Sequence, residues 1–151
     1  NRRGADTCRA RMKAFVPLLL LLGLFTGCTS ASTRQVVSLD AFRRIYVEQR
    51  QSDNNRVDLL LVAELQRLGR TASSGPMTMM PEDTDAVLTY NDRWEWDFKT
   101  YLIELTIELH TAKTRKKLAD GRYHQPTLKT KPAPAVVSEL LGPLFGPAKA
   151  S

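Results

Sequence analysis

The strongest constraint in the sequence is segment 101–110 (YLIELTIELH), in which apolar and polar side chains alternate. Successive side chains of an extended chain point to opposite sides, so one face carries Tyr101, Ile103, Leu105, Ile107 and Leu109. The other face carries the residues between them, two of which are glutamates. A strand that is buried on one face and wet on the other is typical of an antiparallel sheet. The segment therefore predicts a sheet with one covered and one open face.

Other segments predict partner strands for this one. Residues 41–49 (AFRRIYVEQ) and 85–96 (DAVLTYNDRWEW) favour extended chain, and residues 70–74 predict a further short strand. Residues 111–117 turn the chain, and residues 118–124 return as the partner in a hairpin. Basic side chains of this hairpin are expected to pair with the glutamates of the preceding strand, namely Lys116, Lys117 and Arg122.

Two segments predict helices. Residues 54–68 place apolar side chains at steps of three and four, on Val57, Leu60, Leu61, Leu65 and Leu68. Ser52 or Asp53 suits the N-cap, and Gly69 is placed to end this helix in the left-handed conformation. A final helix is expected from residue 135 to residue 141, or as far as residue 145, because Pro143 limits its extension.

These elements predict an α+β domain over residues 39–145: an antiparallel sheet of about four to five strands with two helices packed on one face. Residues 146–151 are expected to form a disordered tail. The domain is long enough for one modest core.

The N-terminal part indicates export. An apolar run spans residues 14–25 (AFVPLLLLLGLF) after Met12 and Lys13, and it is too short to cross the hydrocarbon core of a membrane. Residues 1–27 therefore predict a signal peptide, whose true start is expected at Met12. This segment also holds five basic residues against one acid, so it supplies most of the net charge of +6. The basic charge is consequently no sign of nucleic-acid binding.

Residues 24–28 (LFTGC) resemble the lipobox of bacterial lipoproteins, with Phe25 where the pattern usually has leucine. The resemblance implies cleavage before Cys28, a lipid on its sulfur and an acylated new N-terminus. Residues 28–38 would then be the lipidated cysteine and a flexible tether of small polar residues. Thr29 follows the cysteine in place of an aspartate, which in this family favours the outer membrane. A mature protein whose one cysteine is alkylated has no thiol for catalysis, a disulfide or a metal site.

The two histidines of the exported part do not predict a metal site. Tight pairing of the hairpin places His110 opposite Lys117 or Leu118, which is several residues from His124. No cofactor is expected apart from the covalent lipid.

Aromatic and acidic residues concentrate in segment 90–98 (YNDRWEWDF), which holds both tryptophans. One interpretation is structural, with the rings covering the end of the sheet. A second is a contact site for a partner, formed by Tyr90, Asp92, Trp94, Trp96 and Asp97. A third is glycan binding or cleavage, with Trp94 and Trp96 as the platform and Asp92 or Asp97 as the acid, although such chemistry needs a cleft.

Within residues 85–123, a set of short motifs resembles uncharacterised proteobacterial outer-membrane lipoproteins with a small α/β domain: DAVLTY at 85–90, WEWD at 94–97, YL at 101–102, AKT at 112–114 and LADG at 118–121. Arg115 stands where these proteins usually have glycine. The resemblance implies a fold and a location but no reaction. More distantly, the element order looks like that of accessory lipoproteins of envelope transport, which bind proteins or lipids.

Together these features lead us to expect a non-enzymatic lipoprotein, anchored in the outer membrane and facing the periplasm, that binds another envelope protein. The alternatives are a glycan-binding or glycan-cleaving protein and a lipid-carrying transport subunit. The last of these requires an apolar groove between helix and sheet.

Overall fold

The computed structural model describes residues 29–126 and 130–146 of the chain. The predicted signal peptide, Cys28 and residues 147–151 lie outside the described residues. The described part contains, in chain order, β1 (Ser30–Gln35), β2 (Arg44–Glu48), α2 (Val57–Arg67), β3 (Thr71–Gly75), the 3-10 turn η2 (Met77–Met79), β4 (Ala86–Asp97), β5 (Lys99–Thr111), β6 (Lys117–His124) and α3 (Ala133–Phe145).

The strands form one six-stranded sheet in the order β1-β6-β5-β4-β2-β3. The α+β class with two helices is confirmed, but the sheet is larger than predicted and only partly antiparallel. The pairs β1/β6, β6/β5 and β5/β4 are antiparallel, whereas β4/β2 and β2/β3 are parallel. The parallel pairing of β2 with β3 follows from α2, because a helix that connects two neighbouring strands returns the chain to the same end of the sheet.

The sixth strand, β1, comes from the segment predicted as a flexible tether, and that prediction is wrong for Ser30–Gln35. The segment has no alternation of apolar residues, because most of its side chains are exposed. Its pairing comes from the backbone: β1 lies antiparallel to β6 from Ser30 opposite His124 to Gln35 opposite Ala119. Backbone hydrogen bonds of this kind are available to any residue except proline.

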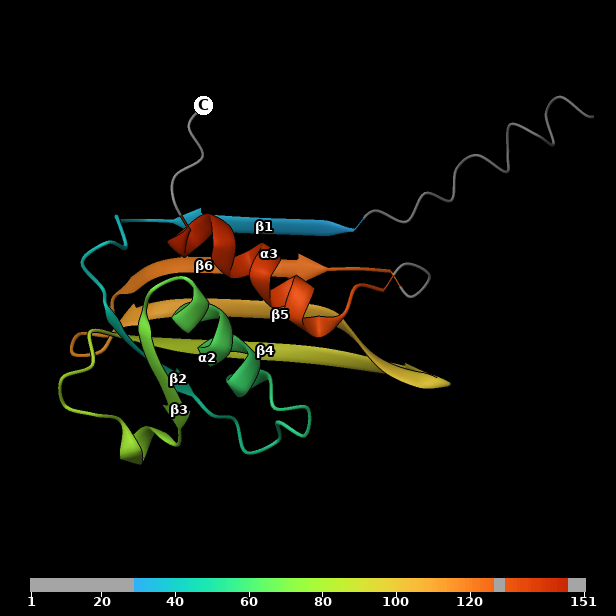
Figure 1. Ribbon diagram of the computed structural model, residues 1–151, viewed down its shortest axis with the longest axis horizontal. Coiled ribbons are helices and arrows are strands. Elements are labelled where there is room, and N and C mark those ends of the chain that lie inside the picture. Colours follow the sequence, from blue (N-terminus) through green and yellow to red (C-terminus); the bar gives the residue numbers. More distant parts are fainter. Residues whose placement is uncertain (1–28, 127–129, 147–151) are drawn as a thin grey trace, which may run out of the picture.

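Both helices cover the same face of the sheet (Figure 1). Val57, Leu61 and Leu65 of α2 are fully buried, as are Leu140 and Leu141 of α3. They pack on the inward residues of the sheet in one core, which includes Leu88, Leu105, Ile107, Leu109 and Tyr123.

The ends of α2 show how the local sequence sets its limits. The helix begins at Val57, three residues later than predicted, because Arg56 is left-handed with φ 54°. The predicted cap Asp53 accepts hydrogen bonds from the backbone N–H groups of Asn55 and Asp58 at 3.1 Å. Gly69 has φ 79° and ends the helix as predicted.

The β4–β5 hairpin is the longest pairing in the fold. Its partners change from Arg93 opposite Glu104 to Trp94 opposite Leu102, so Ile103 is an extra residue on β5. Beyond this bulge the hairpin continues past the rest of the sheet to Phe98, and it projects at the end where β1 begins (Figure 1).

Within the described ranges no helix combines the length and apolar character that a membrane crossing requires.

Hydrogen exchange distinguishes the strand β1 from a tether. Val36 donates its backbone N–H to the Leu118 carbonyl at 2.8 Å, and alternate amides of a strand point the same way. We therefore expect slow exchange at Ser32, Arg34 and Val36 and fast exchange at Ala31 and Thr33, measured by NMR. Uniformly fast exchange over residues 30–36 would contradict the pairing.

Candidate functional site

Three of the predicted contact residues lie on the helix side of β4 at two-residue spacing. The Tyr90 hydroxyl donates to Asp53 Oδ2 at 2.6 Å, and Trp94 Nε1 donates to Asp92 Oδ2 at 2.7 Å. Arg50 Nη1 donates to the other oxygen of Asp92 at 2.7 Å. The loop between β2 and α2 is thus tied to β4 through two carboxylates.

Asp53 is the better buried of these two acids as a residue, with 9% of its surface exposed. Burial raises the pKa of its carboxyl, but hydrogen bonds from Tyr90 and from the backbone N–H groups at the start of α2 outweigh that effect. The net result is a pKa below the ordinary value of an aspartate. The pKa of the Tyr90 phenol is raised, first by burial and then by its bond to Asp53. Asp53 is therefore an anion that holds the structure, and Tyr90 is its neutral donor.

Asp92 and Trp94 are also turned inward. The Asp92 side chain is 8% exposed and forms an ion pair with Arg50. Trp94 is half-buried and packs against the hydrophobic core. The side chains of Tyr90, Asp92 and Trp94 therefore support the root of the hairpin from within.

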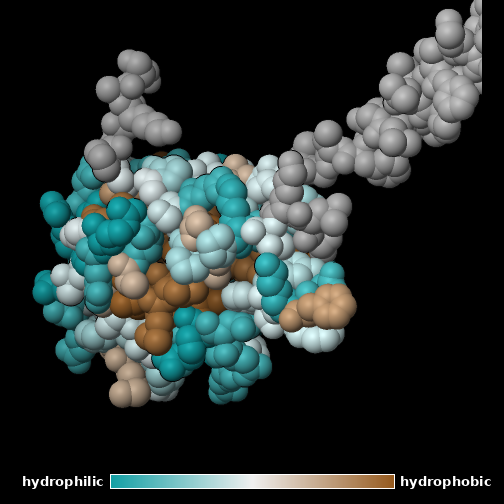
Figure 2. Space-filling view, turned by 45° about the vertical axis from the view of Figure 1, so that its right-hand side comes forward, coloured by the Kyte–Doolittle hydropathy of each residue, from teal (hydrophilic) through white to brown (hydrophobic). Residues whose placement is uncertain are grey.

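The remaining two predicted residues, Trp96 and Asp97, lie beyond the core near the end of the hairpin. Trp96 is 74% exposed, and the neighbouring Phe98 is 94% exposed with φ 59° at the apex. Their ring centroids are 6.4 Å apart. We call Trp96 and Phe98 the aromatic tip. Figure 2 turns this end of the molecule forward and shows apolar side chains there among hydrophilic ones.

Sequence reasoning did not single out Phe98. The available signal was its position: it stands between the two strands, where a turn leaves the side chain without neighbours. A phenylalanine with positive φ is uncommon and exposes a large apolar side chain at the most projecting point of the hairpin.

The carboxylates considered for glycan cleavage do not come together. Asp92 lies on the helix side of β4, whereas Asp97, five residues further along, belongs to the opposite face. Five residues of strand span about 16 Å, well beyond the separation of about 5–10 Å that paired carboxylates need.

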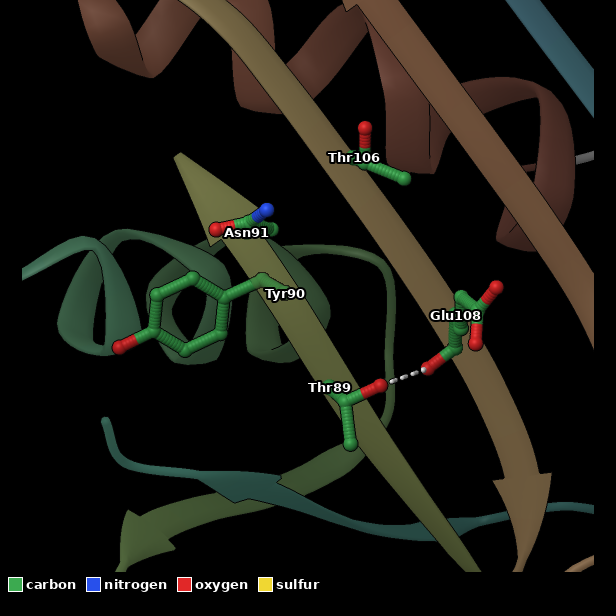
Figure 3. Close-up of a pocket in the computed structure, with 5 residues that line it drawn as sticks. All are labelled: Thr89, Tyr90, Asn91, Thr106 and Glu108. Carbon is green, nitrogen blue, oxygen red and sulfur yellow. Dashed lines mark hydrogen bonds between the residues drawn. The ribbon is translucent and has the colours of Figure 1, made fainter. Parts of the chain in front are cut away.

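The open face of the sheet has a shallow hollow of about 300 Å³. Figure 3 shows Thr89 and Asn91 of β4 and Thr106 and Glu108 of β5 along it, with the Thr89 hydroxyl donating to the Glu108 carbonyl at 3.4 Å. Two ion pairs predicted from the hairpin lie on this face and are confirmed: Lys117 with Glu108 at 2.7 Å and Arg122 with Glu104 at 2.6 Å. The hollow is thus a polar depression in a face of paired charges.

The helix side of the sheet is filled by side chains. Leu61 and Leu65 of α2 and Leu140 and Leu141 of α3 are 0% exposed. The four surface hollows described are lined by polar and apolar residues together. In the described part of the chain, these inward side chains and the sheet form one continuous hydrophobic core.

The outer edge of β1 is a second open feature. The strand lies at the end of the sheet and pairs only with β6. The backbone amides that point toward β6 belong to Ser32, Arg34 and Val36. The residues between them direct their N–H and C=O groups away from the sheet, namely Ala31, Thr33 and Gln35. These groups form a row that can accept another strand.

The histidine pairing agrees with the sequence prediction, because His110 lies opposite Lys117. Among residues 29–126 and 130–146, no group of three or more histidine, cysteine or acidic side chains is placed to hold a metal ion.

Comparison with known proteins gives a likeness of fold. No protein-family model matches the sequence, and no curated protein matches it. PelC, a dodecamer from Paraburkholderia phytofirmans, is 12% identical, with 82% of this chain and 100% of that chain covered and a TM-score of 0.56. A PDZ domain protein from Parabacteroides distasonis is 11% identical over 89% of this chain and 40% of that one, with a TM-score of 0.45. A minor lipoprotein from Acinetobacter baumannii is 18% identical over 70% of this chain and 83% of that one, with a TM-score of 0.32. At these identities the PelC structure supports the fold alone, and the other two scores carry no argument.

The link through Asp53 predicts a pH dependence of stability. The pKa of Asp53 is lower in the folded chain, so its contribution is complete above about pH 5 and is lost as the pH falls through the folded pKa. We expect Asp53→Asn to lower the free energy of unfolding by about 1–3 kcal/mol at pH 7 and by less at pH 3. Urea unfolding at the two pH values measures both. An equal loss at both would show that the charge of Asp53 has no role.

Proposed function

We propose that the chain is a non-enzymatic, lipid-anchored accessory protein of the bacterial envelope, which binds another envelope protein through the free edge of β1. The observation that carries this proposal is the row of backbone groups on Ala31, Thr33 and Gln35, which face away from the sheet. Such an edge binds an extended segment through main-chain hydrogen bonds.

The two edges of the sheet differ in how open they are. Folded proteins close their edges with prolines, charges or short strands. The opposite edge, β3, has five residues and is followed directly by Pro76. By contrast, β1 has six residues, no proline and a single charge, that of Arg34, which pairs with Asp120 at 3.1 Å. The edge of β1 is therefore the better acceptor of a partner strand.

A role without catalysis or cofactor is supported by the state of the buried acids. Asp53 and Asp92 are each held by several donors from the chain itself, so neither is free to act as an acid or base. In this proposal the lipid on Cys28 is the one covalent addition, and Thr29 after it directs the protein to the outer membrane with the domain in the periplasm. Nucleic acid is not expected as a partner.

The partner strand can come from a different protein or from a second copy. PelC, which shares the fold, forms a dodecamer. We favour a different envelope protein, and the test below separates the two.

Thr33→Pro tests the edge without removing a bond within the sheet. Proline is tolerated on an edge strand where its missing N–H would face solvent, and the amide of Thr33 faces outward. Thr33→Ala is the matched control, because it alters the same side chain and keeps the amide. Lipidated full-length proteins are crosslinked in the envelope, and partners are quantified by mass spectrometry.

We expect the main partner to be recovered equally with wild type and Thr33→Ala, and at least tenfold less with Thr33→Pro. Circular dichroism establishes that each variant is folded, and light scattering detects self-association. Equal recovery with a folded Thr33→Pro variant would contradict the edge as the binding site. Loss of self-association in that variant would identify the partner as a second copy.

A further inference from the structure

The aromatic tip leaves large apolar surface in solvent at one projecting point. Trp96 is 74% exposed and Phe98 is 94% exposed, although Trp94, two residues earlier on the same face, packs on the core. The difference arises because the hairpin continues beyond the helices that cover the rest of that face (Figure 1). The tip is thus apolar surface that the fold itself does not use.

The register of the sheet places the tip and the N-terminal end of β1 at the same end of the molecule. Ser30 lies opposite His124, His124 opposite Glu104, and Glu104 opposite Arg93. From Arg93 the hairpin runs on toward Phe98, and from Ser30 the chain leads back toward Cys28. A lipid on Cys28 therefore leaves the domain at the end where the aromatic tip projects.

From these positions we infer that the aromatic tip inserts into the surface of the bilayer that holds the lipid anchor. The inference rests on the proposed lipidation of Cys28 and is independent of the binding edge of β1. The aromatic tip then contacts lipid at the membrane–water interface, and the anchored domain has two attachment points in place of one.

The reach of the two attachments is compatible with one membrane surface. Residues 94–97 extend the hairpin by about 13 Å beyond Arg93, at about 3.3 Å per residue. The two residues from Ser30 back to Cys28 allow about 7 Å. Even a fully extended link of this length is shorter than the extension of the hairpin, so the aromatic tip can reach the membrane surface that holds the lipid.

The chemistry of the tip suits the bilayer interface. Tryptophan is enriched at the level of the lipid headgroups, where its ring is apolar and its N–H is wet. The exposed charges beside the tip balance, with Arg93 and Lys99 against Glu95 and Asp97. Binding should consequently depend on the rings and need no anionic lipid, which selects zwitterionic vesicles as the probe.

The two tryptophans allow a direct test. Lipidated full-length protein is reconstituted in phosphatidylethanolamine–phosphatidylcholine vesicles that contain lipids brominated close to the headgroup. Trp94→Phe leaves Trp96 as the single reporter, and Trp96→Phe leaves Trp94. We expect at least threefold stronger quenching by brominated lipid for Trp96 than for Trp94, and at least threefold weaker quenching of Trp96 by aqueous iodide than in a lipid-free Cys28→Ser protein.

Two further variants separate insertion from simple proximity to the membrane. Phe98→Ser removes half of the tip and should reduce the lipid quenching of Trp96 at least twofold. Met79→Ser is the matched control, because Met79, at 73%, is as exposed as Trp96 but lies after β3, and it should change nothing. Equal effects of the two variants would overturn the inference.

Other outcomes are equally decisive. Mass spectrometry first establishes that Cys28 is lipidated. If iodide then quenches Trp96 equally with and without vesicles, the tip does not insert, although the lipid anchor is present. An unmodified Cys28 overturns the anchor and the insertion together. A photocrosslinker at residue 96 is tested in whole envelopes. If it forms adducts with protein and none with lipid, the tip contacts a protein partner and not the bilayer.

Discussion

The pairing of β4 with β5 is the constraint on which the other parts of the structure depend. These two strands, of 12 and 13 residues, supply the central inward row of the sheet, which shares one core with the buried side chains of both helices. Their length exceeds what two short helices can cover, so the same pairing that builds the core also carries Trp96 and Phe98 out of it. The bulge at Ile103 lies where the covered part of the hairpin gives way to the projecting part.

The buried polar links hold the root of this hairpin. Asp53 joins the start of α2 to Tyr90, and Asp92 joins Arg50 to Trp94. Each link engages a carboxylate with charged or neutral donors, and a buried acid is stabilising only when it is held in this way. Asp53 and Asp92 therefore act as supports at the root of a projecting element.

The sequence predicts those elements whose buried residues recur at a regular spacing. Alternation identified β5, the three- and four-residue spacing identified α2, and Gly69 identified its end. Pairing of Lys117 and Arg122 with glutamates followed from the hairpin register. By contrast, β1 is held by its backbone with exposed side chains, so nothing in its composition distinguishes it from a tether. The parallel position of β2 between β3 and β4 is likewise a property of the whole sheet.

The same limit on prediction from sequence applies to the candidate site. Trp94 and Trp96 have the same residue type and the same facing direction on β4, yet one is half-buried and the other exposed. Which of them the core covers depends on how far the helices reach along the sheet, and no local pattern records that distance. Phe98 shows its significance only once the apex of the hairpin is known.

In the proposed arrangement, the lipid on Cys28 and the tip of the β4–β5 hairpin meet one membrane surface. Spin labels placed singly at residues 91, 93, 95 and 97 sample the open side of β4 from the body to the tip, and a lipidated Cys28 leaves no competing thiol. Electron paramagnetic resonance on vesicles then gives the depth of each label from its access to oxygen and to a water-soluble nickel chelate. We predict an aqueous label at residue 91, a label in the bilayer interface at residue 97 and a steady change between them. Equal access of the nickel chelate to all four labels would show that the tip does not enter the bilayer.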